Sequence, residues 1–224
     1  MTARIIRLWD IETPVTGYLV GVLFGDGSAY VGAHRGYVSL DAGDEGFVRS
    51  TFEALTAVVP SGWARFSGPS KRQMFRAKVS SLVLARLLCD RYGSFGTHEW
   101  SAARFLKRKP SAAAIGSMLA GLFDSDGHVG ANGARAQIRI TSTNRRGLES
   151  LLPAVELLGM EAGVVRNGGA VRSWALQFSR ADTSAEFVLR CGTANWSKVA
   201  RVREDLSLVP RDPVRGTALR RNHR

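Results

Sequence analysis

Two Asp-Gly pairs, Asp26-Gly27 and Asp126-Gly127, close two similar segments of the chain. The segments read GYLVGVLFGDGSAY over residues 17–30 and SMLAGLFDSDGHVG over residues 117–130. Aspartate is ionised at neutral pH, and its hard oxygen atoms are the ligands that Mg²⁺ prefers. Two such carboxylates repel each other unless a cation lies between them. If the segments meet, the sequence predicts a divalent-metal site that activates water at a phosphodiester.

Small residues recur at every fourth position of both apolar runs, which places them on one face of a helix. Interior glycine costs a water-soluble helix roughly 1 kcal/mol relative to alanine, so the pattern requires a compensating contact. Small residues let two helix backbones approach closely. We therefore expect the two helices to pack against each other, so that Asp26 and Asp126 meet at their C-terminal ends. The small residues are Gly17, Gly21, Gly25, Ser117, Gly121 and Ser125.

The residues after each run predict the same order of elements twice: helix, two strands, helix, two strands, helix. In the first copy the expected elements are a hairpin over 27–40, a helix over 44–58, strands 63–67 and 72–79, and a helix between Ser80 or Ser81 and Gly93. In the second copy they are strands 127–131 and 135–142, a helix over 146–160 kinked or begun at Pro153, strands 162–166 and 171–178, and helices 182–190 and 195–206. We expect repeats at 12–100 and 110–206, a basic linker at 101–109 and a basic tail at 207–224.

The stretches LVGVLFGDG (19–27) and LAGLFDSDG (119–127) resemble the two signature motifs of the LAGLIDADG homing endonucleases. The resemblance implies a monomeric α+β protein with two pseudo-symmetric αββαββα repeats. The motif helices would pair, and two antiparallel sheets would form a DNA-binding saddle. The family cuts both strands of a long, nearly palindromic DNA site with divalent metal and leaves 3′ overhangs.

The resemblance also implies which residues carry the reaction. Asp26 and Asp126 occupy the positions of the metal-binding, catalytic carboxylates, and the backbone carbonyls of Gly25 and Ser125 occupy positions that contact metal. Mg²⁺ is the expected ion and Mn²⁺ an alternative, whereas Ca²⁺ is expected to bind without supporting cleavage.

A basic residue stands near the scissile phosphate in the family, and Lys198 matches it in the second repeat. The matching stretch of the first repeat, GTHEWSAARFL, has Trp100 or Ser101 at that place. Possible substitutes are Lys78, Arg104 and Lys107. The motifs differ in a second way, because Phe24 replaces the acidic residue that Asp124 retains.

The charge of the chain favours a polyanionic partner. There are 31 Lys and Arg against 19 Asp and Glu, a formal net charge of +12. Expected strands alternate apolar with basic or amide side chains, and Arg and Gln read guanine and adenine in the major groove. The residues expected to contact DNA are Tyr30, His34, Arg35, Tyr37, Ser39, Arg65, Arg72, Arg76 and Lys78 in the first repeat, and His128, Asn132, Arg135, Gln137, Arg139, Thr141, Arg166, Arg172 and Gln177 in the second.

Two other functions share this scaffold: a non-catalytic DNA-binding protein, such as a decayed endonuclease or regulator, and an intron RNA maturase. The substitution at Phe24 favours the first of them. The apolar runs are too short for a membrane span, and the first residues are too polar for a signal peptide, so we expect an intracellular protein. Double-stranded DNA is the expected partner of a monomer that requires no partner protein.

Overall fold

The computed structural model describes residues 12–132, 135–168, 172–178, 181–195, 197–198 and 200–201. The expected tail at 207–224 and most of the expected helix 195–206 lie outside these residues. So do the side chains of Asn132 and Arg135, two of the predicted DNA contacts. Within the described ranges, every helix is too short or too polar to span a membrane.

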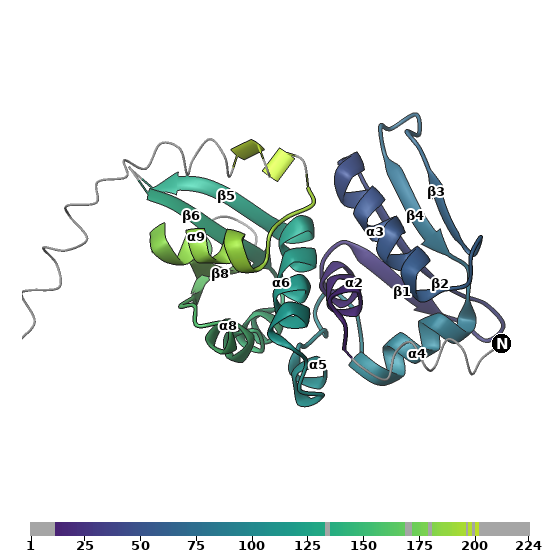
Figure 1. The fold of residues 1–224 in the computed structure, drawn as a ribbon, viewed down its shortest axis with the longest axis horizontal. Helices are drawn as coiled ribbons and strands as arrows, with labels where there is room; N and C mark the ends of the chain where they lie inside the picture. Colours follow the sequence, from purple (N-terminus) through teal and green to yellow (C-terminus); the bar gives the residue numbers. More distant parts are fainter. Residues whose placement is uncertain are drawn as a thin grey trace, which may run out of the picture.

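The elements follow the predicted order in both copies (Figure 1). The first copy consists of α2 (Pro14–Phe24), β1 (Gly27–Val31), β2 (Gly36–Ala42), α3 (Glu45–Val58), β3 (Ala64–Ser67), β4 (Phe75–Val79) and α4 (Leu82–Tyr92). The linker contains α5 (Ala103–Lys107). The second copy consists of α6 (Ala112–Asp126), β5 (Gly127–Asn132), β6 (Arg135–Ser142), α7 (Arg145–Glu149), α8 (Leu152–Leu157), β7 (Gly163–Arg166), β8 (Trp174–Phe178) and α9 (Ala181–Arg190).

Three expected boundaries were wrong, and local contacts explain two of them. The strand expected over 72–79 begins at Phe75, because the backbone N–H groups of Arg72 and Met74 donate to the Ser70 hydroxyl within a turn. The helix expected over 146–160 is divided into α7 and α8, with Pro153 in the first turn of α8, where a proline lacks no required hydrogen bond. The strand expected over 171–178 begins at Trp174.

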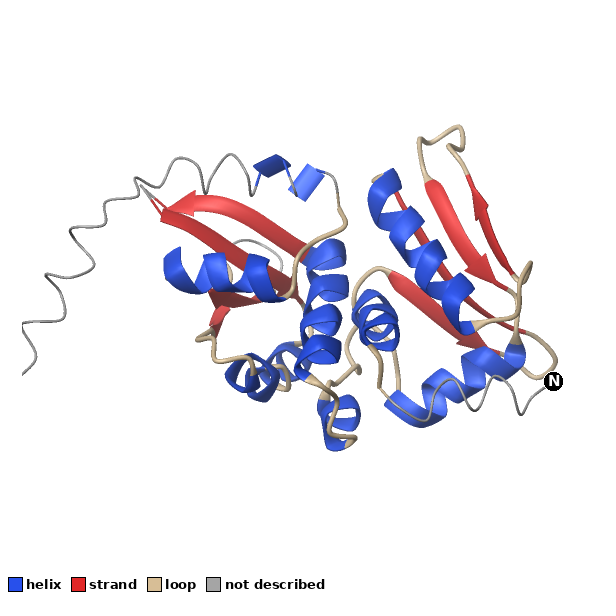
Figure 2. Ribbon diagram, in the orientation of Figure 1, coloured by secondary structure: helices blue, strands red, loops and turns tan. Residues whose placement is uncertain are grey.

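Helices α2 and α6 pack side by side at the centre of the molecule, with one sheet on each side (Figure 2). Their contact is made by backbone against backbone. A Cβ on Gly21 would lie 2.0 Å from the Met118 carbonyl oxygen, and a Cβ on Gly121 would lie 2.2 Å from that of Tyr18. The predicted helix pairing is therefore confirmed, and the glycines are required by the close approach of the helices.

Each copy contains a four-stranded antiparallel sheet, with strand orders β1-β2-β4-β3 and β5-β6-β8-β7. One face of each sheet is apolar and packs on helices. Val38, Leu40 and Val79 form this face in the first sheet, and Ile138, Ile140 and Phe178 form it in the second. The opposite face carries polar and basic side chains, as the alternation predicted. This arrangement confirms the expected α+β fold with two pseudo-symmetric repeats.

The linker and the start of α2 are joined by a buried ionic cluster. Glu12 is 5% exposed and accepts hydrogen bonds from the Arg91 guanidinium (2.9 Å from Nη2), the Tyr92 hydroxyl and the Arg108 guanidinium. Phe105 of α5 is fully buried against the same region. These contacts fix the N-terminal ends of α2 and α6, which are opposite to the ends that carry Asp26 and Asp126 (Figure 1).

Candidate active site and nucleic-acid interface

The two motif carboxylates lie at the C-terminal ends of the paired helices. Asp26 follows the last turn of α2, and Asp126 is the last residue of α6. The ends are in close contact, since a Cβ on Gly25 would lie 2.3 Å from the Ser125 Cβ and 3.3 Å from an Asp126 carboxylate oxygen. Asp26 is exposed and Asp126 half-buried. The helix pairing therefore brings the two predicted catalytic acids together.

The acids influence each other electrostatically. Burial, followed by the charge of Asp26, raises the pKa of Asp126 to about 7, while Lys198 opposes the rise. Partial desolvation also raises the pKa of Asp26, although the residue is exposed, and Lys198 again opposes the rise. Carboxylates that resist ionisation because they share a site gain from a nearby cation. Lys198 is the cation that acts on both acids.

Lys198 lies at the C-terminal end of α6. Its Nζ donates to the carbonyl oxygens of Phe123, Asp124 and Ser125 at 2.5, 2.7 and 3.0 Å. The Phe123 carbonyl also accepts from the Gly127 N–H, whereas the Asp124 and Ser125 carbonyls belong to the last turn, which lacks partners inside the helix. The end of the helix dipole favours a positive charge there. Burial nevertheless lowers the pKa of Lys198 to about 8, against the opposing charges of Asp124, Asp26, Asp126 and Asp44.

Asp124 binds the segment that precedes Lys198 in the chain, residues 193–195. Its side chain is 1% exposed and accepts hydrogen bonds from the Tyr18 hydroxyl (2.9 Å), the Thr193 hydroxyl and the Ala194 amide (2.9 Å). Burial raises the pKa of Asp124, and these hydrogen bonds, that of Thr193 first, oppose the rise. The side chain of Asn195 also contacts this residue, because its amide nitrogen donates to the Asp124 backbone carbonyl at 3.1 Å.

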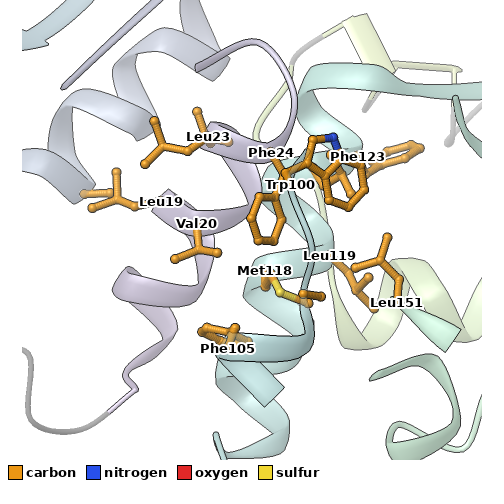
Figure 3. Packing of buried hydrophobic residues seen from close by; sticks show 14 of the residues in the cluster. Leu19, Val20, Leu23, Phe24, Trp100, Phe105, Met118, Leu119, Phe123 and Leu151 are labelled. Carbon is orange, nitrogen blue, oxygen red and sulfur yellow. The ribbon is translucent and has the colours of Figure 1, made fainter. Parts of the chain in front are cut away.

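The same corner of the first repeat is apolar. Phe24 stacks on Trp100 with ring centroids 4.9 Å apart and lies 5.8 Å from Phe95 (Figure 3). By comparison with Lys198, a basic residue was expected in the first repeat at position 100 or 101. Trp100 stands there instead and is buried, and Ala102 near it is also buried. In the first repeat, packing of aromatic rings replaces the polar contacts of Asp124.

The three basic residues expected to substitute in the first repeat lie elsewhere. Lys78 is on β4, where its Nζ stands 4.7 Å over the Tyr37 ring. Arg104 and Lys107 are on α5, beside the N-terminal end of α6 and away from the acids (Figure 1). The structure therefore places none of the three beside Asp26.

Asp44 and Asn144 occupy equivalent places, and sequence analysis missed both. Asp44 caps α3 by accepting from the Phe47 amide at 2.9 Å, and Asn144 caps α7 by accepting from the Gly147 amide at 2.9 Å. Each also reaches the other repeat. Asp44 accepts from the amide and hydroxyl of Ser197 at 3.1 and 3.0 Å, while the Asn144 amide donates to the Trp100 carbonyl at 2.8 Å. The expected helices begin at or near these two residues, but neither the caps nor the contacts with the other repeat were predicted.

The polar face of the first sheet is aromatic and basic. Tyr30 stacks on Tyr37 with centroids 5.3 Å apart, next to the row formed by Ser39, Lys78 and Arg65. A shallow cavity of about 520 Å³ on this face is lined by Trp63, Arg65, Phe66, Ser67, Arg76, Lys78 and Ser80. Trp63 is 37% exposed, so it adds an apolar surface that sequence analysis did not assign to this face.

The polar face of the second sheet has a different character. His128, Arg139 and Gln177 form one row across β5, β6 and β8. Gln137, on the same face of β6, is only 7% exposed. Among the described side chains, Arg139 Nε is buried without a hydrogen-bond partner. An unpaired buried donor costs free energy, so the Arg139 Nε–H is a donor for an acceptor from outside the protein.

The other predicted contacts lie at the edges. His34 and Arg35 are exposed in the β1–β2 turn, and Arg166 and Arg172 are exposed at and near the β7–β8 connection. Arg72 is in a turn rather than on a strand. Arg76 pairs with Asp41 at 2.5 Å. Thr141 is half-buried on β6.

The donor set at the paired helix ends fits a hard divalent ion. In the described part of the chain, no group of three or more His, Cys, Asp or Glu side chains could enclose a metal. The two carboxylates fit Mg²⁺, which is commonly bound by one or two carboxylates together with water and substrate phosphates. The Ser125 carbonyl already accepts a hydrogen bond from Lys198, so of the two predicted carbonyl ligands this one has a competing partner.

Comparison with known proteins agrees with this geometry. A family model described as a LAGLIDADG-like domain matches residues 113–195. A solved structure of I-DmoI in complex with DNA and Ca has a TM-score of 0.60 at 14% identity, over 85% of this chain and 97% of that one. I-WcaI bound to its DNA recognition sequence has a TM-score of 0.54 at 10% identity, over 82% and 83%. No curated protein matches.

The chain therefore has the two-repeat fold of these solved structures, and the family-model match supports the resemblance to LAGLIDADG proteins over the segment that contains the second motif. The second repeat contains the LAGLIDADG-like domain. The same fold also occurs in the N-terminal LAGLIDADG domain of DUF199/WhiA, with a TM-score of 0.53 at 12% identity over 80% of this chain and 82% of that one. Since several kinds of protein share the fold, function must be argued from the site.

Proposed function

We propose that this protein is a site-specific, metal-dependent DNA endonuclease of the homing type. It would hydrolyse both strands of a long, nearly palindromic site and leave 3′ overhangs. The observation that carries the proposal is the meeting of Asp26 and Asp126 at the ends of α2 and α6, with Lys198 acting on both. Solved relatives bound to DNA, with Mn in one I-DmoI structure and Ca in another, support it.

The residues of the site have distinct proposed roles. Asp26 and Asp126 would hold Mg²⁺, with Mn²⁺ as an alternative and Ca²⁺ binding without cleavage; the Gly25 carbonyl is the remaining proposed backbone ligand. When bound, the metal supplies Lewis acidity and lowers the pKa of its water. Lys198 would stabilise negative charge near the scissile phosphate. Its Nζ donates to three carbonyls at the end of α6, and its charge acts on both carboxylates.

The two polar sheet faces are the proposed DNA-reading surface of a monomer made of the repeats 12–100 and 110–206. Arg139 and Gln177 are suited to base edges in the second sheet, and Arg65 and Lys78 to phosphates or guanine in the first. A net charge of +12 predicts that affinity falls steeply with salt, because each neutralised phosphate releases counterions.

The test replaces the acids without changing their shape. Asp26→Asn and Asp126→Asn should each reduce double-strand cleavage in Mg²⁺ by about 10³-fold or more, because a carboxamide binds the cation weakly. Affinity for the same DNA, measured in Ca²⁺, should change less than threefold, or about 0.7 kcal/mol. The matched control is Glu53→Gln, an exposed carboxylate on α3. The target site would come from selection of cleaved sequences in a randomised DNA library.

Cleavage by either Asn variant at the wild-type rate would remove that acid from the proposed role. Binding of a defined site with no cleavage in Mg²⁺ or Mn²⁺ would instead favour a non-catalytic DNA-binding protein. One observation favours this second function: Lys198 is engaged by three carbonyls, and no basic side chain replaces it in the described first repeat at Phe24 and Trp100.

A further inference from the structure

The segment that carries Lys198 is fixed at both ends, and residues of the first repeat take part at each end. At one end, Asp124 holds Thr193 and Ala194, and Asp124 is itself contacted by the Tyr18 hydroxyl from α2. This end of the segment is anchored to the helix pair. Through the Tyr18 hydroxyl, the hydrogen-bonded group around Asp124 in the second repeat includes a residue of the first repeat.

At the other end, the anchor is Asp44 of the first repeat. One carboxylate oxygen accepts from both the backbone N–H and the hydroxyl of Ser197, at 3.1 and 3.0 Å. The second oxygen caps α3 through the Phe47 amide at 2.9 Å. The carboxylate therefore joins the start of α3 to the residue immediately before Lys198. Hydrogen bonds to an ionised acceptor are among the stronger ones in proteins.

We propose that Asp44 is a positioning residue: it holds Ser197 and thereby keeps Lys198 at the end of α6, beside Asp26 and Asp126. The value of this position for catalysis rests on the proposed endonuclease function. The cation of the second repeat would then depend on an acid of the first repeat, so that the pocket is complete only when the two repeats are docked.

The pseudo-symmetric partner explains why the residue type matters. Asn144 uses its amide nitrogen as a donor toward the Trp100 carbonyl. At the equivalent place, Asp44 must accept from two donors. Asparagine at position 44 would still cap α3 through its oxygen, because Asn and Asp are equally good caps. Its amide group would present a donor to the Ser197 N–H, which would lose its acceptor, whereas the Ser197 hydroxyl can rotate to accept from the amide.

Asp44→Asn therefore separates the contact with Ser197 from the stability of α3. The matched control is Glu45→Gln, which removes the neighbouring charge of the same helix turn and affects only the pair with Arg49. Ser197→Ala is a second variant, since it removes the hydroxyl contact and keeps the amide contact. Its effect should be smaller than that of Asp44→Asn and in the same direction.

The first measurement is amide hydrogen exchange of the metal-free, DNA-free protein. In Asp44→Asn, peptides covering Gly192 to Lys198 should exchange roughly tenfold faster than in the wild type, because losing one or two kcal/mol changes an opening equilibrium by about 5- to 30-fold. Peptides of α3 should be unchanged. Glu45→Gln should exchange like the wild type throughout.

The second measurement is single-turnover cleavage in Mg²⁺, with DNA affinity measured separately in Ca²⁺. Asp44→Asn should slow cleavage by about 10- to 100-fold, since a small displacement of a catalytic group has effects of this size. Its affinity for DNA should stay within threefold of the wild type. A variant that only destabilised the fold would lose DNA affinity and thermal stability together, and we do not expect that combination for Asp44→Asn.

Unchanged exchange in Asp44→Asn would overturn the proposal, because Ser197 would then not depend on Asp44. Faster exchange with cleavage equal to that of Glu45→Gln would also overturn it, since Lys198 would not need the anchor. A wild-type protein that binds but cuts no DNA would contradict the endonuclease function instead. In that case the exchange measurement still decides whether Asp44 holds the Lys198 segment.

Discussion

The corner at Phe24 and the corner at Asp124 occupy equivalent places beside the helix pair, yet they are stabilised in opposite ways. Phe24 packs between Trp100 and Phe95. Asp124 is surrounded by donors from Tyr18, Thr193 and Ala194. The backbone symmetry of the repeats is therefore kept while the chemistry of the two corners differs. Only the polar corner brings a cation, Lys198, to the acids.

This difference has a functional consequence. Asp26 and Asp126 come from different repeats, but the same lysine opposes the rise in the pKa of each carboxyl. The proposed pocket is thus shared rather than duplicated. Its two halves should respond differently to equivalent substitutions, and this can be measured in three ways.

The largest effect should come from making the polar corner apolar. Asp124→Leu should lower the free energy of unfolding by roughly 3–5 kcal/mol, because each buried donor left unpaired costs about 1–3 kcal/mol. Phe24→Leu should cost about 1–2 kcal/mol, since most of the buried volume is kept. Urea unfolding measures both. Equal losses would show that the two corners are stabilised alike, against the comparison.

A second effect concerns the shared lysine. Lys198→Met should slow cleavage of both DNA strands by about 100-fold, which is typical for loss of a group that assists proton transfer or charge stabilisation. Strand-specific labels on the two DNA ends would follow each cut separately. Lys71→Met, in the exposed turn before β4, is the control. Slowing of one strand alone would mean that the other pocket uses a different cation.

The smallest effect should be the pH dependence of stability in the metal-free protein. The pKa of Asp126 is raised from its ordinary value to about 7 in the folded chain, so the folded state binds a proton that the unfolded state has already lost. Stability should therefore fall as pH rises from about 4 to 7. In EDTA, the unfolding temperature of the wild type should drop by roughly 5 °C between pH 5 and 8.

Asp126→Asn should show a smaller drop over the same range, because the carboxamide does not ionise. Asp90→Asn, an exposed acid at the end of α4, should behave like the wild type. A slope that is the same in all three proteins would assign the pH dependence to groups outside the acid pair. It would also argue against the electrostatic coupling that we infer between the carboxylates of Asp26 and Asp126.

Much of the fold follows from local patterns. The spacing of Gly17 and Gly21 predicted the helix pair, and alternation along β4 and β6 predicted which face of each sheet is polar. The late start of β4 depends on a side-chain contact with the backbone. The Ser70 hydroxyl accepts hydrogen bonds from backbone amides that a strand would otherwise have paired. The hydrophobic periodicity of the sequence does not reveal this contact.

The sequence by itself determined the order of the elements, the close pairing of α2 and α6, and the two acids at their ends, because each follows from a pattern within short segments of the chain, such as the four-residue spacing of small residues in both helices. The tertiary structure decided which side chains join the acids. It placed Lys198 on three carbonyls of α6, left Arg104 and Lys107 at the opposite end, and brought Asp44 to Ser197. Such contacts form between residues far apart in the chain, so they depend on how the two repeats dock.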